Sequence, residues 1–208
     1  MRTLRKAYLE ITNVCNLSCA FCPGTRRPAS FLSPEDFHTL AAKLRPHTQY
    51  LYLHLMGEPL LHPRLDAILA QAEELGFHVM LTTNGTLLGR RQNLLLSSPA
   101  VKKVSVSLHS FEGSQREGLT DYLTGCLSFA KAAGEAGKKC ALRLWNLGEA
   151  HGYNRLNGDI LAALEMAFSP PWTEGRRGTT LAPNVFLEWG ERFDWPDLSA
   201  SAGQAPTF

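Results

Sequence analysis

The sequence predicts an α/β fold with a parallel sheet, and two observations support this prediction. Six short stretches rich in β-branched and other apolar residues alternate with amphipathic helical stretches along the 208 residues, as in parallel βα units joined by right-handed crossovers. Three of these predicted strands also alternate apolar with polar side chains, whereas a strand covered by helices on both faces is almost continuously apolar. Periodicity alone leaves an open doubly wound sheet and a curved half-barrel as alternatives. One polar face per strand favours the half-barrel, whose inner side would line a wet cavity that holds a ligand.

The predicted strands follow one another at intervals along the chain. They span Ala7–Thr12, Tyr50–Met56, Phe77–Thr82, Val101–Leu108, Cys140–Trp145 and Val185–Trp189. In the fourth of them Val104 shares one face with Val106, and Ser105 lies on the other, because side chains alternate along a strand. The last predicted strand, Val185–Trp189, would present an unpaired edge, and such edges invite association with other chains.

Local chemistry marks where the helices between these strands begin and end. The first helix is opened by Ser33–Asp36 and stopped by Pro46; the others cover Pro63–Leu75, Leu87–Leu96, Leu119–Ala136 and Asp159–Phe168. Ser33 is a good N-cap, the proline that follows suits the first turn, and the next two acids complement the helix dipole. Gly76 and Gly137 stand just past two helix ends, where glycine readily adopts the left-handed conformation.

Length and composition describe one soluble globular domain with 44% hydrophobic and 19% charged residues. A net charge of +2 gives no support for nucleic acid or a membrane as a partner. No apolar run approaches the ~20 residues of a membrane span. Five cysteines, three of them clustered, argue against a disulfide scaffold and for a reducing, cytoplasmic location.

Three cysteines within eight residues form the chemical centre of the sequence. Cys15, Cys19 and Cys22 are spaced Cys-x3-Cys-x2-Cys, and thiolates this close can converge on one soft metal centre. A [4Fe–4S] cluster normally takes four thiolates, so three ligands would leave one iron open, as one position is open in catalytic zinc sites. Zinc is the alternative, but it would need a fourth ligand, and the next histidine, His38, lies beyond a proline-containing loop. The spacing therefore favours a cluster.

With the aromatic Phe21 just before the last cysteine, this spacing resembles the signature of the radical S-adenosylmethionine (SAM) enzymes. The resemblance implies a partial (β/α)6 barrel of the TIM type and a [4Fe–4S] cluster whose open iron chelates the amino and carboxylate groups of SAM. In that family one electron, delivered by a donor such as a flavodoxin or ferredoxin, cleaves SAM to methionine and a 5′-deoxyadenosyl radical. The radical then abstracts a hydrogen atom from the substrate.

We expect the SAM contacts at the carboxyl ends of the strands, where the loops of a barrel gather. Met56-Gly57-Glu58-Pro59, after the second strand, resembles the Gly-Gly-Glu-Pro motif of the family. There the backbone and the Glu58 side chain are expected to accept hydrogen bonds from the SAM amino group, which is a cation. An isolated Gly-Glu-Pro would be an ordinary turn. The resemblance thus assigns the adenine to Phe21 and the amino group to the Gly57–Glu58 edge.

The ends of the third and fourth strands supply further candidates. Thr83 and Asn84 precede a glycine in a turn that the resemblance places close to SAM; the alternative is a plain strand-to-helix turn, since Asn-Gly accepts positive φ. After the fourth strand, Ser107 and His109 are placed to bond the ribose hydroxyls or the carboxylate. Many family members have Asp at the position of His109. The alternative for this residue is an interior histidine whose hydrogen-bond partners are all protein groups.

Arg143 lies between two leucines in the fifth predicted strand, so its charge must face the cavity or find a partner. It would either form a brace with Glu10 or bind a carboxylate, and the brace is favoured. The sequence assigns no role to His54. Cys126 falls on an apolar helix face and Cys140 at a strand start, as buried small hydrophobes do.

From Tyr8 to Trp195 the chain resembles the core of bacterial radical SAM proteins that carry a C-terminal SPASM domain with auxiliary clusters, as peptide-modifying enzymes do. No cysteine follows Cys140. We therefore expect a radical SAM core over residues 1–198 and a disordered tail or truncated linker over residues 199–208. The chain would be a fragment of a longer protein or a reduced version, and the fragment is favoured.

The predicted function is reductive cleavage of SAM for hydrogen abstraction from an unknown substrate, for which a peptide is one candidate. The alternative is a non-catalytic iron–sulfur or zinc-binding module, or an inactive truncated fragment.

Overall fold

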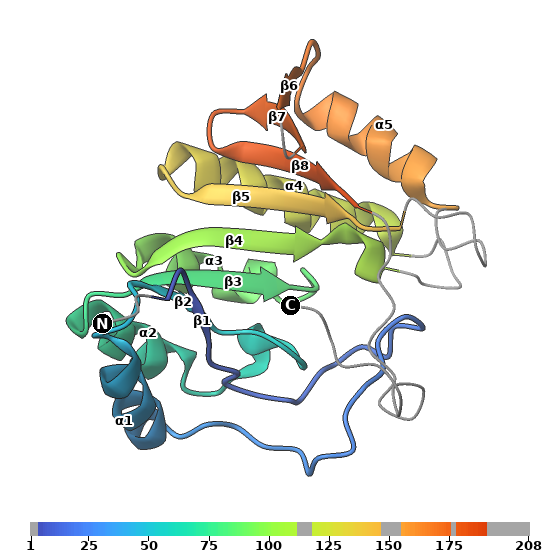
Figure 1. Ribbon diagram of the computed structural model, residues 1–208. Coiled ribbons are helices and arrows are strands. Elements are labelled where there is room, and N and C mark those ends of the chain that lie inside the picture. The colour runs from blue at the N-terminus through green and yellow to red at the C-terminus, as the bar shows by residue number, and fades with distance from the viewer. Residues whose placement is uncertain (1–3, 112–117, 147–154, 176–177, 191–208) are drawn as a thin grey trace, which may run out of the picture.

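The structure is a computed structural model that describes residues 4–111, 118–146, 155–175 and 178–190 (Figure 1). One eight-stranded sheet has the order β1-β2-β3-β4-β5-β8-β7-β6. The strands are β1 (Ala7–Tyr8), β2 (Tyr50–Tyr52), β3 (His78–Thr83), β4 (Val101–Ser107), β5 (Lys139–Leu144), β6 (Thr173–Gly175), β7 (Gly178–Ala182) and β8 (Val185–Trp189). The helices are α1 (Pro34–Leu44), α2 (Leu65–Glu74), α3 (Leu88–Ser97), α4 (Leu119–Glu135) and α5 (Asn157–Ala167), with short 3-10 helices η1 (Pro59–Leu61) and η2 (Leu108–Ser110).

Six strands, β1 to β5 and β8, lie side by side in chain order, and each is parallel to its neighbour. Helices connect most of them, as expected of βα units. Over the described residues, β1 pairs only with β2 and the sheet does not close. The predicted α/β class and the partial barrel are therefore confirmed. The predicted boundary between residues 198 and 199 lies outside the described residues.

Local chemistry sets the helix ends as predicted. The Ser33 hydroxyl accepts a hydrogen bond from the Asp36 N–H at 3.0 Å and so caps α1. α2 and α4 both end at a glycine in the left-handed conformation, Gly76 with φ 72° and Gly137 with φ 71°. In both, the N–H of the next residue bonds back to a carbonyl of the last turn at 2.8 Å, which satisfies groups that a helix end leaves unpaired. No helix within the described ranges is long and apolar enough to cross a membrane.

Alternating side chains bury one face of the sheet under the helices. In Figure 1, α3 and α4 lie behind the strands. The buried core contains Val79, Leu81, Val104, Val106 and Leu142 from the sheet and Ile68, Leu95, Phe129 and Ala130 from the helices. Burying one large apolar side chain contributes about 1.5–3 kcal/mol. This layer fixes the strands whose ends carry the candidate site.

Two short strands that the sequence did not predict change the edge of the sheet. β6 and β7 form an antiparallel hairpin, and β7 pairs antiparallel with β8, with Thr179 opposite Leu187. The prediction that Val185–Trp189 presents an unpaired edge is therefore wrong. The hairpin escaped prediction because β6 has three residues, all exposed, and no apolar alternation. A very short edge strand also gives other chains little to pair with.

The first two strands are shorter than predicted, because the chain leaves the sheet early. β1 ends at Tyr8 and β2 at Tyr52. Beyond β1, Thr12 forms an isolated antiparallel bridge with Phe31. This bridge closes the base of the loop that carries the three clustered cysteines.

Candidate functional site

The cysteine loop leaves β1 and runs across the ends of neighbouring strands. Cys15 and Cys22 are exposed, Cys19 is half-buried, and none of them is in a disulfide. The Cys22 N–H bonds to the Cys19 carbonyl at 3.0 Å in a turn. Cys19 Sγ lies 3.8 Å from the carbonyl oxygen of Ser110, in the segment that follows β4. The loop therefore touches a strand end about 90 residues away in the sequence.

The other two cysteines are buried, as predicted. Burial raises the pKa of the Cys126 thiol to about 12 and also raises the pKa of Cys140. Both thiols therefore stay protonated at neutral pH and lack the thiolate form that binds metals.

A positive φ of 73° at Gly57 lets the loop after β2 pack directly on the start of the cysteine loop. A Cβ at this position would lie 2.6–2.8 Å from backbone atoms of Thr12, Asn13 and Val14, so a larger residue would force these segments apart. The next N–H group, that of Glu58, bonds to the Val14 carbonyl at 2.8 Å. The segment that the sequence matched to SAM binding thus contacts the cysteine loop backbone to backbone.

The Glu58 side chain turns inward and is 1% exposed. Its Oε1 accepts from the Leu60 N–H at 3.0 Å, which caps η1, and its Oε2 accepts from the Asn84 N–H at 2.7 Å. The Thr83 side chain is a third hydrogen-bond partner. Burial raises the pKa of Glu58, and these three partners offset the effect only in part. The carboxyl group therefore joins the loop after β2 to the loop after β3.

Asn84 extends this connection to the cysteine loop. Its Nδ2 donates to Asn16 Oδ1 at 3.0 Å and lies 3.9 Å from Cys15 Sγ. Thr83, beside it, is buried, and its hydroxyl accepts from the N–H two residues on at 3.1 Å. The structure thus brings Cys15, Glu58 and Asn84 together, although 69 residues separate the first from the last.

Phe21 and His109 meet at the end of β4. Their ring centroids are 5.2 Å apart, and the His109 ring also stacks on Trp145, with the centroids 6.5 Å apart. His109 Nδ1 lies 3.1 Å from the Arg143 carbonyl oxygen and 3.4 Å from the Trp145 N–H. His109 therefore has hydrogen-bond partners within the protein and also lies beside Phe21, which is predicted to contact SAM. Ser107 ends β4 and is half-buried.

Arg143 pairs with Glu188 rather than with the predicted Glu10. Arg143 Nε and Lys103 Nζ bind the two carboxylate oxygens of Glu188 at 2.8 and 2.6 Å; we call these three residues the inner-face charge cluster. Glu10 instead binds Arg27 of the cysteine loop at 2.6 Å. The predicted brace between Arg143 and Glu10 is therefore wrong, because the acidic partner of Arg143 is Glu188, which lies opposite it on β8. Burial raises the pKa of Glu188, but the Lys103 hydrogen bond and the Arg143 charge outweigh burial and lower it overall.

His54 lies beside this cluster, where sequence reasoning assigned it no role. Its Nε2 is 2.9 Å from the hydroxyl of Thr82, which also accepts from Arg143 at 3.3 Å. Nδ1 is buried, with no hydrogen-bond partner among the described residues. Burial lowers the pKa of His54 to about 4, and the Arg143 charge adds to the effect. The imidazole is therefore neutral near pH 7.

Residues 9–138 match the family model of the radical SAM superfamily. This range contains the cysteine loop, the Gly57–Glu58 loop and the ends of β3 and β4. The chain belongs to the radical SAM superfamily. The predicted family is thereby confirmed, and so is the prediction that the chain comes from a class of enzymes.

Individual radical SAM relatives match part of the chain. A probable GTP 3′,8-cyclase from Pyrobaculum aerophilum is 30% identical over 122 residues, which are 57% of this chain and 39% of the relative. Streptococcus suis SuiB bound to S-adenosylmethionine superposes with a TM-score of 0.58 at 21% identity over 76% of this chain and 38% of SuiB. SuiB bound to the precursor peptide SuiA gives 0.56 at 21% identity over 76% of this chain and 36% of SuiB. The chain thus spans about two-fifths of the length of these proteins or less, and the likeness to SuiB shows the fold.

The cysteine loop supplies the donors that the cluster of this superfamily needs. Three thiols, two of them exposed, stand on one segment that has no helix or strand of its own, and thiolates are the usual ligands of iron–sulfur clusters. As the side chains stand, the sulfurs do not converge: within the described residues, no three His, Cys, Asp or Glu side chains form a group that could hold a metal ion. Exposed side chains change rotamer within nanoseconds. Cys15 and Cys22 are exposed and so can rotate, and the set of three thiols fits a cluster by its chemistry.

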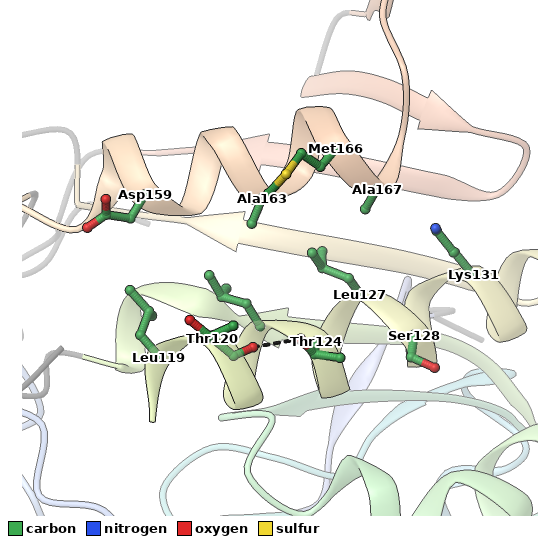
Figure 2. Close-up of a pocket in the computed structure, with 11 residues that line it drawn as sticks. Leu119, Thr120, Thr124, Leu127, Ser128, Lys131, Asp159, Ala163, Met166 and Ala167 are labelled. Atoms are coloured by element: carbon green, nitrogen blue, oxygen red, sulfur yellow. Dashed lines mark hydrogen bonds between the residues drawn. The ribbon is translucent and has the colours of Figure 1, made fainter. Parts of the chain in front are cut away.

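A separate cavity of about 640 Å³ lies between α4 and α5, and Figure 2 shows side chains of both helices around it. Leu123 and Leu127 of α4 line it together with Ala163 and Met166 of α5. Its described lining includes no residue of the cysteine loop or of the predicted SAM contacts. This cavity is therefore not part of the candidate site.

Proposed function

We propose that this chain binds one [4Fe–4S] cluster through Cys15, Cys19 and Cys22 and binds SAM at the fourth iron. When bound, the cluster supplies the electron that cleaves SAM to methionine and a 5′-deoxyadenosyl radical, which abstracts hydrogen from the substrate. The protein's part is to hold three thiolates, orient SAM and keep water from the reacting atoms.

One observation carries this proposal: the cysteine loop contacts the loops after three successive parallel strands. It contacts the loop after β2 through the bond between the Val14 carbonyl and the Glu58 N–H, at 2.8 Å. It contacts the loops after β3 and β4 through Asn84 and Ser110. Barrel enzymes place their chemistry at this end of the strands, so three thiols here, none of them in a disulfide, support a catalytic cluster more than a surface zinc-binding site.

For the amino group of SAM, we propose the backbone carbonyls of Gly57 and Glu58 as the acceptors. The Glu58 carboxyl already accepts from the Leu60 and Asn84 N–H groups, so its role would be to hold the loop in place. Thr83 and Asn84 would position the same edge of the site from β3, because both contact Glu58.

For the rest of SAM, we propose contacts from the cysteine loop and the end of β4. Phe21 would stack against the adenine, with the His109 ring 5.2 Å away as a second aromatic surface. Ser107 and His109 would bond the ribose hydroxyls or the carboxylate, since both stand where the strand gives way to η2.

We further propose a peptide substrate, a flavodoxin or ferredoxin as electron donor, and a cytoplasmic location. SuiB, which shares the fold, has been seen bound to a precursor peptide, and this supports the peptide class. None of the five cysteines is in a disulfide, and this supports a reducing compartment.

The test is anaerobic reconstitution with iron and sulfide, followed by SAM and dithionite. We expect about four irons and four sulfides per chain and formation of 5′-deoxyadenosine, measured by liquid chromatography. About one zinc per chain with no iron or sulfide would favour the zinc-binding module. A bound cluster without 5′-deoxyadenosine would favour the non-catalytic iron–sulfur module.

Cysteine variants provide the matched controls. Cys15→Ala, Cys19→Ala and Cys22→Ala should each abolish the cluster. Cys126→Ala and Cys140→Ala should retain it, because both thiols are buried and protonated at neutral pH. Equal iron content in all five variants would contradict the assignment of the ligands.

A further inference from the structure

Three side chains from two loops close a ring of hydrogen bonds beside the first cysteine. Asn84 Nδ2 donates to Asn16 Oδ1 at 3.0 Å, and Asn16 Nδ2 donates to Thr86 Oγ1 at 2.9 Å. Thr86 Oγ1 in turn donates to Asn84 Oδ1 at 2.7 Å. Within the ring each of the three side chains donates once and accepts once, so the ring is complete.

A backbone group determines which way the Asn84 amide faces. The backbone N–H of Thr86, which can only donate, also bonds to Asn84 Oδ1 at 3.0 Å. The oxygen must therefore face Thr86, and the NH2 group must face the cysteine loop. One of its hydrogens serves Asn16, and the other points to Cys15 Sγ at 3.9 Å.

The backbone of Asn84 is held on both sides as well. Its N–H donates to Glu58 Oε2 at 2.7 Å, and its carbonyl accepts from the Tyr122 hydroxyl at 2.8 Å. The residue is only 8% exposed. An amide fixed from so many directions presents its N–H group in one orientation, without an ordering cost when a ligand binds.

We propose that Asn84 is a positioning residue that donates an N–H to the sulfur of Cys15 when that sulfur holds the cluster, and that this hydrogen bond raises the reduction potential of the cluster. This inference rests on the proposed function. The step is the uptake of one electron from an external one-electron donor, and no proton moves. The reduced cluster carries one more negative charge than the oxidised one, and an N–H donor stabilises a sulfur ligand more strongly as that charge grows.

The experiment measures the midpoint potential of the reconstituted cluster by redox titration followed with electron paramagnetic resonance. Asn84→Ala removes the donor. At a fixed potential we expect the ratio of reduced to oxidised cluster to fall about tenfold, which is a shift of about 59 mV to more negative values for a one-electron couple. Thr86→Val is the matched control: it opens the ring but keeps the backbone N–H that orients the amide, so its potential should stay near that of the wild type.

The outcomes separate this inference from the proposed function. A wild-type chain that takes up no cluster overturns both. A wild-type cluster whose potential is the same in Asn84→Ala overturns the inference alone. A second measurement needs no variant: pulsed resonance on the reduced wild-type protein, with 15N in its asparagine side-chain amides, should show a 15N coupling to the cluster. Absence of that coupling also overturns the inference.

Discussion

Glu58 and Glu188 are both well removed from solvent, yet their surroundings move their pKa values in opposite directions. Glu58 is 1% exposed and accepts from uncharged N–H groups of Leu60 and Asn84; burial raises its pKa. The Glu188 side chain is 19% exposed and binds two cations, which lower its pKa against the effect of burial. The same residue type thus serves in two different kinds of contact.

The difference shows that two regions of the molecule are held by different forces. The strand-end loops are joined by donors that do not titrate, so their geometry responds little to salt. The inner-face charge cluster depends on ionised groups, and its contribution to stability must change with pH.

The largest change in the free energy of unfolding should come from removing the Glu58 carboxyl, which accepts from the N–H groups of Leu60 and Asn84. Glu58→Ala leaves the buried N–H groups of Leu60 and Asn84 without their acceptor. Each such loss costs about 1–3 kcal/mol, so the free energy of unfolding should fall by about 2–6 kcal/mol. Urea denaturation at pH 7 measures this change.

Glu58→Gln is the matched control for that prediction. It keeps one carbonyl oxygen but turns an NH2 group toward the other donor, so its effect should be smaller than that of Glu58→Ala. A Glu58→Ala chain as stable as the wild type would show that the two loops are held by other contacts.

The second prediction concerns His54, beside the charged region. Burial and the Arg143 charge lower its pKa from the ordinary 6.5 to about 4. Between these values the unfolded chain binds a proton that the folded chain does not, so the free energy of unfolding should fall as the pH drops from about 6.5 to about 4. The full effect of this one group is on the order of 3 kcal/mol.

The control is His54→Gln, which cannot take up the proton. Urea denaturation of both chains at several pH values isolates the contribution of His54 as the difference between the two curves. Parallel curves across this range would mean that His54 titrates normally in the folded protein.

The contrast between the two regions also explains what the sequence could predict. Helix ends were predictable because Ser33, Gly76 and Gly137 act on their own neighbours. The polar face of the strands was predictable from alternation. The partner of Arg143 was not, because the order of strands decides it: β8 lies beside β5, whereas three strands separate β5 from β1 and Glu10.

The candidate site was predictable in its residue types but not in its contacts. Motif spacing pointed to the three cysteines and to Glu58, Asn84 and His109. It did not show that the Glu58 carboxyl is occupied by N–H groups, because one of them belongs to Asn84, 26 residues further on. Asn16 and Thr86 were missed, since an Asn and a Thr in separate loops carry no periodic signal. The only hint was an Asn directly after Cys15, combined with Thr-Asn-Gly-Thr at a strand end.

The smallest effect is expected for the charge cluster itself. Glu188→Gln keeps the shape of the side chain but removes the charge that Lys103 and Arg143 share. The free energy of unfolding at pH 7 should fall by about 1.5–3 kcal/mol, as for a hydrogen bond to a charged group. Glu10→Gln is the control, because its partner Arg27 is 57% exposed and an exposed pair contributes at most about 1 kcal/mol.

The dependence on pH decides whether charge is the cause. The folded pKa of Glu188 lies below its ordinary value of 4.5, so its stabilising contribution is present above about pH 4.5 and is lost as the pH falls through the folded pKa. The difference in stability between wild type and Glu188→Gln should therefore be constant near neutral pH and shrink in acid, as urea denaturation across this range would show. A difference that stays constant in acid would mean that Glu188 stabilises the fold through packing and not through its charge. The comparison of Glu188, bound by cations, with Glu58, bound by uncharged N–H groups, would then fail.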